Sequence, residues 1–367
     1  MNSSRTIDII SNLTQKVSPA SSDVSDDVYM VILFVTNIII ANILSLLGIL
    51  GSILNIIILS YHKMQDTTNI VLLFISICDL IYSITQISFI LSESAFFIHW
   101  YIYQWVFITN NLIFSRFNFL AVIASIHLVT LVSIERMVAI CFPFHVSRVF
   151  TLFRMKCIIV GIVFCNIILQ TPSFFSYEMY YIQYKNVTIP VLRYGDLYYR
   201  NFDFLNKYSI ITSILFLTLL PFCVIFICTS LTIFNISMTS KTKASIFSKE
   251  AIAKRKKEMK SVKIVLIICV LILFLVLIPF FVQQILFTFA LVQISKKQFK
   301  ILFWIVNLLA QINSSFNFVI YVTSFSSERV VLLSSAICAP VFTARQHDAL
   351  SCASIYQLQG SMLKAFK

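Results

Sequence analysis

The stretch "SIERMVAICFPFHV", residues 133–146, decides the fold. An apolar run long enough to cross a membrane ends here on an adjacent acid and base, Glu135 and Arg136. Neighbouring residues on a helix point to different faces, so the two do not form a simple pair along one face. An arginine that reaches out to the membrane surface would explain the base but leave the acid unexplained. The pattern predicts a guanidinium at the mouth of a spanning helix, followed by Pro143 and a projecting apolar residue, Phe144.

The composition of the whole chain places this stretch in a membrane protein. Of its 367 residues, 59% are hydrophobic and only 12% are charged, whereas soluble domains average about 45–50% apolar and about 25% charged residues. A net charge of +13 would indicate a nucleic-acid partner in a soluble protein. In a membrane protein, Lys and Arg instead mark the cytoplasmic loops. We therefore expect membrane lipids, and no nucleic acid, among the partners.

Several apolar segments are long enough to cross a bilayer as helices, since a span needs about 20 mostly apolar residues. Seven can be delimited, at residues 32–60, 69–92, 106–134, 156–177, 208–236, 261–292 and 299–323. The sequence thus predicts an all-α membrane protein, with a seven-transmembrane helix bundle over residues 31–323. Residues 1–30 are expected to form an extracellular tail, and residues 324–367 to lie in the cytoplasm.

Two independent patterns indicate the same orientation of the helices. Basic residues crowd the connection between the fifth and sixth spans, which places this connection in the cytoplasm and the N-terminus outside. The glycosylation acceptors Asn2, Asn12 and Asn186 then all lie on the outer side. All nine cysteines fall in predicted helices or on the cytoplasmic side, so no extracellular disulfide is expected. We predict a multi-pass protein of the plasma membrane.

One ionisable side chain, Asp79, lies about midway along the second span, where a charge is costly and indicates a functional site. Ser125 in the third span and Asn313 and Asn317 in the seventh lie at a similar depth. These groups suit either a structural hydrogen-bond network around the carboxylate or a site for a monovalent cation. Residue types alone favour the structural network.

Together these residues resemble the rhodopsin-like family of G-protein-coupled receptors, over residues 31 to about 338. The opening stretch is similar to the acid–Arg–aromatic motif of that family, with Met137 in place of the aromatic residue. Asp79 matches the aspartate of helix two. "NFVIY", residues 317–321, resembles the Asn-Pro-x-x-Tyr motif of helix seven, with Phe318 in place of proline.

Further matches and departures lie in other parts of the chain. Pro221 and Pro279 match prolines of helices five and six, and each is expected to kink its helix. "SFSSERVVLLSSAIC", residues 324–338, resembles a short amphipathic eighth helix that ends in a palmitoylation site, Cys338. The extracellular disulfide of the family is absent, and Leu277 replaces the tryptophan of helix six.

The resemblance implies a receptor that activates a heterotrimeric G protein. In the family, the arginine of helix three is held by its neighbouring acid until helix six moves outward and exposes it to the G protein. The resemblance assigns six residues to the coupling face: Glu135, Arg136, Pro143, Phe144, Glu258 as a second acid near the foot of helix six, and Tyr321. It also favours an allosteric sodium ion at Asp79, Ser125, Asn313 and Asn317. No other cofactor and no enzymatic activity are expected.

The residues that line the outer half of the predicted bundle bear on the ligand. The amine-binding aspartate of the family is Asn118 here, and its retinal-binding lysine is Gln311, so neither a biogenic amine nor retinal is expected. The candidate pocket residues are mostly polar and uncharged: Gln86, Glu93, Asn118, Gln283, Gln284 and Gln311.

The class of ligand stays open between two kinds. The second outer connection, residues 176–204, is rich in tyrosine, which suits recognition of a peptide over a broad surface. Tyrosines close to the helices also fit an interfacial belt. Helix seven resembles that of invertebrate neuropeptide receptors of the FMRFamide-receptor-like kind, so we favour a peptide, with a small chemosensory molecule as the alternative. A transporter is the rival from another class, but no internal repeat is visible.

Overall fold

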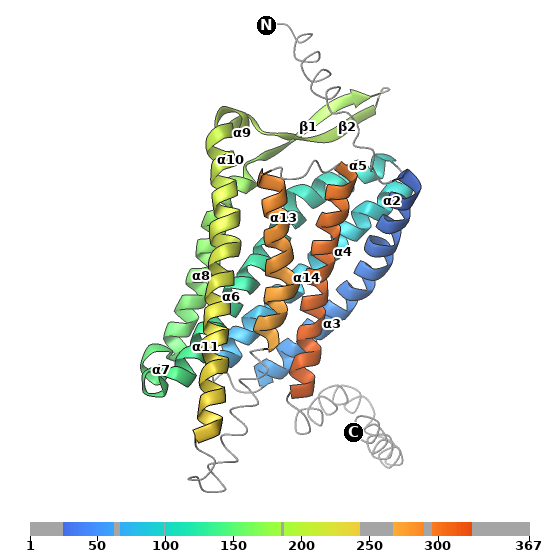
Figure 1. The fold of residues 1–367 in the computed structure, drawn as a ribbon. Coiled ribbons are helices and arrows are strands. Elements are labelled where there is room, and N and C mark those ends of the chain that lie inside the picture. The colour runs from blue at the N-terminus through green and yellow to red at the C-terminus, as the bar shows by residue number, and fades with distance from the viewer. Residues whose placement is uncertain are drawn as a thin grey trace, which may run out of the picture. The chain divides into compact units, whose positions relative to one another are not determined.

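The structure is a computed structural model that describes residues 25–61, 67–98, 100–184, 187–242, 267–289 and 296–324. Contacts between the helices gather the described residues from Ser25 to Tyr321 into one unit, in which the helices lie side by side as a bundle (Figure 1). Several predicted sites lie outside the described residues: the acceptors Asn2, Asn12 and Asn186, the second acid Glu258, and the eighth helix with Cys338.

The first four helical stretches follow the predicted order of spans, and two of them contain a π-helical segment. The first consists of α2 (Asp26–Leu33), η1 (Phe34–Ile40) and α3 (Ala41–Tyr61). The second is α4 (Thr67–Ile98). The third consists of α5 (Trp100–Thr109), η3 (Asn110–Phe114) and α6 (Ser115–Cys141), and the short α7 (Pro143–Val149) leads to α8 (Leu152–Phe174).

The second half of the chain starts with a hairpin and continues with three helical stretches. The hairpin consists of β1 (Tyr177–Tyr184) and β2 (Val187–Tyr194). The fifth stretch consists of α9 (Asp196–Arg200), α10 (Phe202–Ile211), η4 (Thr212–Leu219) and α11 (Leu220–Thr242). Residues 267–272, η5 (Leu273–Leu277) and α13 (Ile278–Phe289) form the next, and α14 (Lys296–Ser324) the last.

Long apolar helices dominate the described residues, as the sequence predicts. Five are long and apolar enough to cross a membrane: Asp27–Ser60, Thr67–Leu91, Ile102–Cys141, Leu152–Pro172 and Phe202–Ile236. A shorter apolar helix covers Ile267–Gln283. These helices support a helical membrane bundle, and the full count of seven spans stays a prediction.

The burial pattern is that of a protein surrounded by lipid. Large apolar side chains are exposed along the helices, among them Val160 at 65% and Phe234 at 60%. Polar side chains such as Asn55, Asp79 and Thr232 are instead buried between helices. Because an apolar exterior of this extent would aggregate in water, the bundle presents these faces to the hydrocarbon of a bilayer.

The helices are disturbed at both predicted prolines. Pro221 is the second residue after η4, and Pro279 is the second residue after η5. Proline lacks the N–H that would bond to the carbonyl four residues earlier, and the wider π turn lies at that point. In η4 the hydroxyl of Thr218 donates to the backbone oxygen of Ser213, at 2.9 Å. The sequence predicted a kink at each proline, and the structure places a π turn there.

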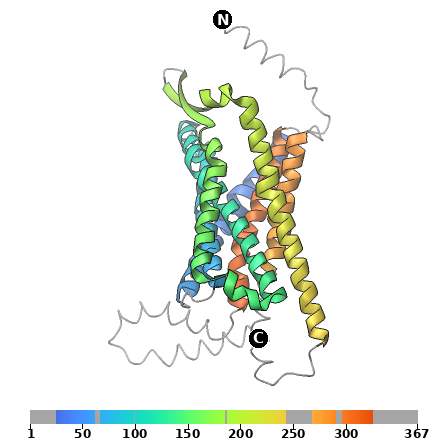
Figure 2. The same ribbon diagram turned by 90° about the vertical axis from the view of Figure 1, so that its left-hand side faces the viewer.

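The hairpin is an element that the all-α prediction missed. Its strands pair antiparallel, from Tyr177 opposite Tyr194 to Tyr184 opposite Val187. The hairpin and α7 lie at opposite ends of α8 (Figures 1 and 2). We call these two ends of the bundle the hairpin end and the α7 end.

Candidate functional site

Asp79 is the centre of a polar network that joins three helices. It lies on α4 and is only 6% exposed. The Nδ2 atom of Asn317 on α14 donates to the Oδ2 atom of Asp79 at 2.7 Å. The hydroxyl of Ser125 on α6 reaches its Oδ1 atom at 3.4 Å. The structure thus brings together three of the four residues that the sequence assigned to a cation site.

The fourth, Asn313, lines a cavity of about 20 Å³ beside the carboxylate, together with Asp79 and Ser125. The Oδ1 atoms of Asn313 and Asn317 are buried and accept no hydrogen bond within the described residues. A cavity of this size has room for one water molecule or a small ion. Carboxylate and amide oxygens are ligands of hard cations, so these residues fit a sodium ion.

Glu135 and Arg136 lie near the α7 end of α6, and both are tied to the start of α4. The Glu135 Oε1 atom accepts hydrogen bonds from the hydroxyls of Thr67 and Thr68, the latter at 2.9 Å. The Nη2 atom of Arg136 donates to the same Thr68 hydroxyl. Thr68 therefore bridges the acid and the base, a role that nothing in the sequence around Thr68 indicated.

The bridge at Thr68 predicts the effect of removing one hydroxyl. Changing Thr68 to Val keeps the shape of the side chain but removes the contacts to both Glu135 and Arg136. Since a hydrogen bond to a charged group contributes about 1.5–3 kcal/mol, we expect basal signalling in a reporter cell to rise several-fold. The matched control is Thr67→Val, which removes only a bond to Glu135 and should raise it less. Unchanged basal signalling in Thr68→Val would show that the bridge does not restrain the arginine.

The two residues expected after the charge pair begin a short helix. Pro143 is the first residue of α7, where its missing N–H costs nothing because the first N–H groups of a helix have no partner. Phe144 is 92% exposed. A phenylalanine so exposed near Arg136 provides an apolar contact surface at this end of the bundle. The side chain of the remaining candidate here, Tyr321, lies outside the described part of the structure.

Four of the candidate ligand residues are buried between the helices. Gln86, Asn118, Gln283 and Gln311 are each at most 9% exposed. The amide of Asn118 donates to the hydroxyl of Thr85 on α4 at 2.8 Å, so part of its hydrogen-bonding capacity is used within the bundle.

Gln311 differs from Asn118 in this respect. Its Oε1 atom is buried and accepts no hydrogen bond within the described residues, which makes it the strongest candidate in this set for a ligand contact. The side chains of Glu93 and Gln284 lie outside the described part of the structure.

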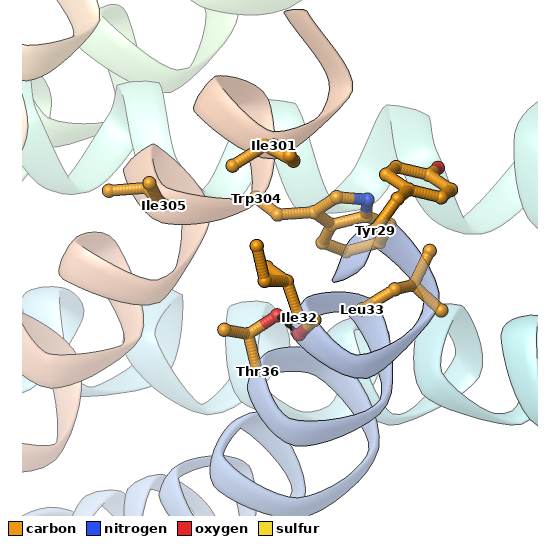
Figure 3. A pocket seen from close by; sticks show the side chains of 7 residues that line it. All are labelled: Tyr29, Ile32, Leu33, Thr36, Ile301, Trp304 and Ile305. Atoms are coloured by element: carbon orange, nitrogen blue, oxygen red, sulfur yellow. Dashed lines mark hydrogen bonds between the residues drawn. The ribbon is translucent and has the colours of Figure 1, made fainter. Parts of the chain in front are cut away.

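A second cavity, of about 10 Å³, lies between α2 and α14 (Figure 3). Aliphatic side chains and Trp304 form most of its lining, and the Thr36 hydroxyl donates to the Ile32 carbonyl oxygen at 2.6 Å. The cavity holds at most one water molecule. It is therefore a packing gap between two helices rather than a ligand pocket.

A comparison with known protein families matches the region of the chain that contains these sites. The sequence model of the 7 transmembrane receptor (rhodopsin family) matches residues 52–321, which include Asp79, Arg136 and Asn317. The chain belongs to the rhodopsin family of seven-transmembrane receptors. This confirms the resemblance drawn from the sequence, and it places the receptor in a family that acts by signalling and is generally not enzymatic.

The chain is also similar to one individual receptor of known ligand class. The receptor is 27% identical over 294 residues to the FMRFamide receptor of Drosophila melanogaster. The alignment covers 77% of this chain and 50% of that protein, so the chain spans about half the length of the curated relative it matches. Its similarity to a neuropeptide receptor agrees with the motif in helix seven.

Proposed function

We propose that this receptor binds an extracellular peptide at the hairpin end of the bundle and activates a heterotrimeric G protein at the α7 end. The position of Arg136 is the observation that supports G-protein activation at the α7 end. Its guanidinium lies near the end of α6, bonded to Thr68, and the exposed Phe144 lies on α7, which begins seven residues further along the chain. In this proposal the protein lies in the plasma membrane with its N-terminus outside.

The peptide half of the proposal rests on the likeness to the FMRFamide receptor and on the surface of the hairpin. Tyr180, Tyr181 and Tyr199 are 47%, 48% and 63% exposed. Exposed tyrosines provide large contact areas with a polar tip, which suits peptide recognition. A small chemosensory ligand is the alternative, favoured by the buried, unbonded oxygen of Gln311. The transporter alternative is disfavoured because the chain belongs to a receptor family.

The test is activation of a G-protein reporter in cells that carry the receptor. Amidated neuropeptides are compared with small volatile compounds and amines as separate sets, and each active compound is repeated on Arg136→Ala. We expect signal from the peptide set and none from the variant. A response confined to small volatile compounds would favour the chemosensory alternative, and a response that ignores Arg136 would contradict the coupling assignment.

We also propose that the Asp79 network binds a sodium ion. When bound, the ion supplies a positive charge that compensates the buried carboxylate. Asp79 would hold it together with the oxygens of Ser125, Asn313 and Asn317, and the two unbonded amide oxygens support this.

The sodium proposal predicts an ion-specific gain in stability. In sodium chloride, the purified receptor should melt at least about 1 °C higher than in choline chloride of equal strength, since about 1 kcal/mol of binding corresponds to about 1–2 °C for a chain of this length. Asp79→Asn should abolish this difference. Asp196→Asn, a similar change at an exposed residue of α9, should keep it. A full sodium effect in Asp79→Asn would exclude this site.

A further inference from the structure

Aromatic rings and one arginine form a continuous stack at the base of the hairpin. The Arg116 Cζ atom lies 5.4 Å from the centroid of the Tyr177 ring. Tyr177 stacks on Tyr194 with centroids 4.8 Å apart, and Tyr194 stacks on Tyr198 at 4.4 Å. Phe202 meets Tyr198 edge-on at 5.5 Å. These distances are those of favourable aromatic and cation–π contacts.

The stack joins elements that are far apart in the sequence. Arg116 belongs to α6, where its guanidinium also lies 6.0 Å from the ring of Phe174, the last residue of α8. Tyr177 and Tyr194 are the first and last residues of the hairpin and face each other across it. The hydroxyl of Tyr177 donates to that of Tyr194 at 3.3 Å. The stack therefore links α6 directly to the point where the hairpin begins and ends.

The contact to Arg116 is a cation–π contact rather than an ion pair. Burial raises the pKa of Tyr177, and neighbouring Tyr194 raises it further. Burial also raises the pKa of Tyr198. Both phenols therefore stay neutral at physiological pH, and the guanidinium faces an uncharged ring, which attracts cations through its quadrupole.

No covalent bond can take the place of this contact. The sequence has no cysteine between Cys165 and Cys223, so the hairpin is held only by packing and polar contacts. Its second point of attachment is α5, against which β2 packs. The ring of Trp105 on α5 lies 6.3 Å from that of Tyr181 on β1, and Ile189 of β2 is 1% exposed.

We propose that Arg116 is a positioning residue that anchors the base of the hairpin to α6 through the ring of Tyr177. The anchor is noncovalent, so the hairpin can detach and dock again without any bond being broken. Access to the hairpin end of the bundle then depends on this equilibrium. A second arginine, Arg193, makes a contact of the same kind entirely within the hairpin, since its Cζ atom lies 4.4 Å from the Tyr180 ring. Arg193 therefore provides a matched control.

The test measures how often the buried position Ile189 of the hairpin becomes accessible. Ile189→Cys places a thiol at a buried position of β2. The purified full-length receptor is treated with a maleimide, and labelling of residue 189 is followed by mass spectrometry. In the Ile189→Cys receptor, the further change Arg116→Ala should raise the labelling rate about tenfold, because it removes a partly desolvated cation–π contact. Arg116→Lys keeps the charge and should raise it less.

The control variants separate anchoring from general destabilisation. Arg193→Ala removes the contact to Tyr180 and the 3.9 Å ion pair with Glu178, and we expect it to label at the rate of the parent. Equal rates for Arg116→Ala and the parent, or equal increases for both alanine variants, would overturn the proposal. If Arg116→Ala does not fold, Tyr177→Phe and Tyr177→Ala replace it. Tyr177→Phe, which keeps the ring, should be labelled slowly at residue 189, and Tyr177→Ala should be labelled fast. Equal labelling rates for these two variants would again overturn the proposal.

Discussion

Replacing Arg136 with alanine is expected to reduce G-protein activation to the background of cells that lack the receptor. The guanidinium offers five N–H donors in a fixed, planar arrangement, and alanine offers none. Removing one partner of a desolvated, hydrogen-bonded charge contact costs about 2–5 kcal/mol, which corresponds to a loss of more than tenfold in coupling. The measurement is reporter signal at equal surface expression.

The control for this prediction is a second arginine at the same end of the bundle. Arg148 on α7 is exposed, and the contact made by Arg154 to its backbone oxygen survives truncation of the side chain. We expect Arg148→Ala to keep most of the signal. Arg136→Lys should fall between the two, because lysine keeps the charge but loses the planar set of donors. Equal losses in the two alanine variants would point to the charge of the whole surface instead of Arg136.

Changes at two residues that contact each other, Arg136 and Thr68, are expected to have opposite effects on signalling. This makes the proposed role of Arg136 easier to test. Arg136→Ala removes the group that we propose meets the G protein, whereas Thr68→Val removes a contact that ties this group to α4. The first change should silence the receptor and the second should activate it. The second acid predicted for Arg136, Glu258, stays a prediction, and reversing both charges together would show whether the two residues are paired.

The spans and the Asp79 network were predictable from the sequence because membranes allow few alternatives. A segment of about 20 apolar residues has hardly any place other than a spanning helix. A carboxylate within such a segment needs polar partners at its own depth. Counting residues along each helix was therefore enough to predict that Ser125 and Asn317 would reach Asp79, and both do.

The contacts made by Thr68 and Arg116 were beyond the reach of such reasoning. Thr68 bonds to Glu135 across 67 positions of the chain, and a threonine near a helix end carries no signal that singles it out. Arg116 lies 61 positions before its ring partner in the chain. Its partner Tyr177 depends on the hairpin, and "YEMYYIQY" lacks the strict alternation of polar and apolar residues that predicts a strand.

Replacing Gly48 with valine is expected to destabilise the bundle. A Cβ atom at this position of α3 would lie 2.5 Å from the Oγ atom and 3.3 Å from the Cβ atom of Ser83 on α4. Small residues let membrane helices approach closely. Overpacking costs about 1–3 kcal/mol, so we expect Tm to fall by about 1–4 °C and surface expression to fall with it.

The matched control is Gly161 on α8, where an added Cβ atom would meet no atom within 4 Å. Gly161→Val makes the same chemical change on an exposed face and should leave Tm nearly unchanged. A rescue identifies the cause. Ser83→Ala removes the nearer obstructing atom, so Gly48→Ala should be tolerated better in that background than alone. If Gly48→Val and Gly161→Val melted at the same temperature, helices α3 and α4 would not be packed as closely as the structure shows.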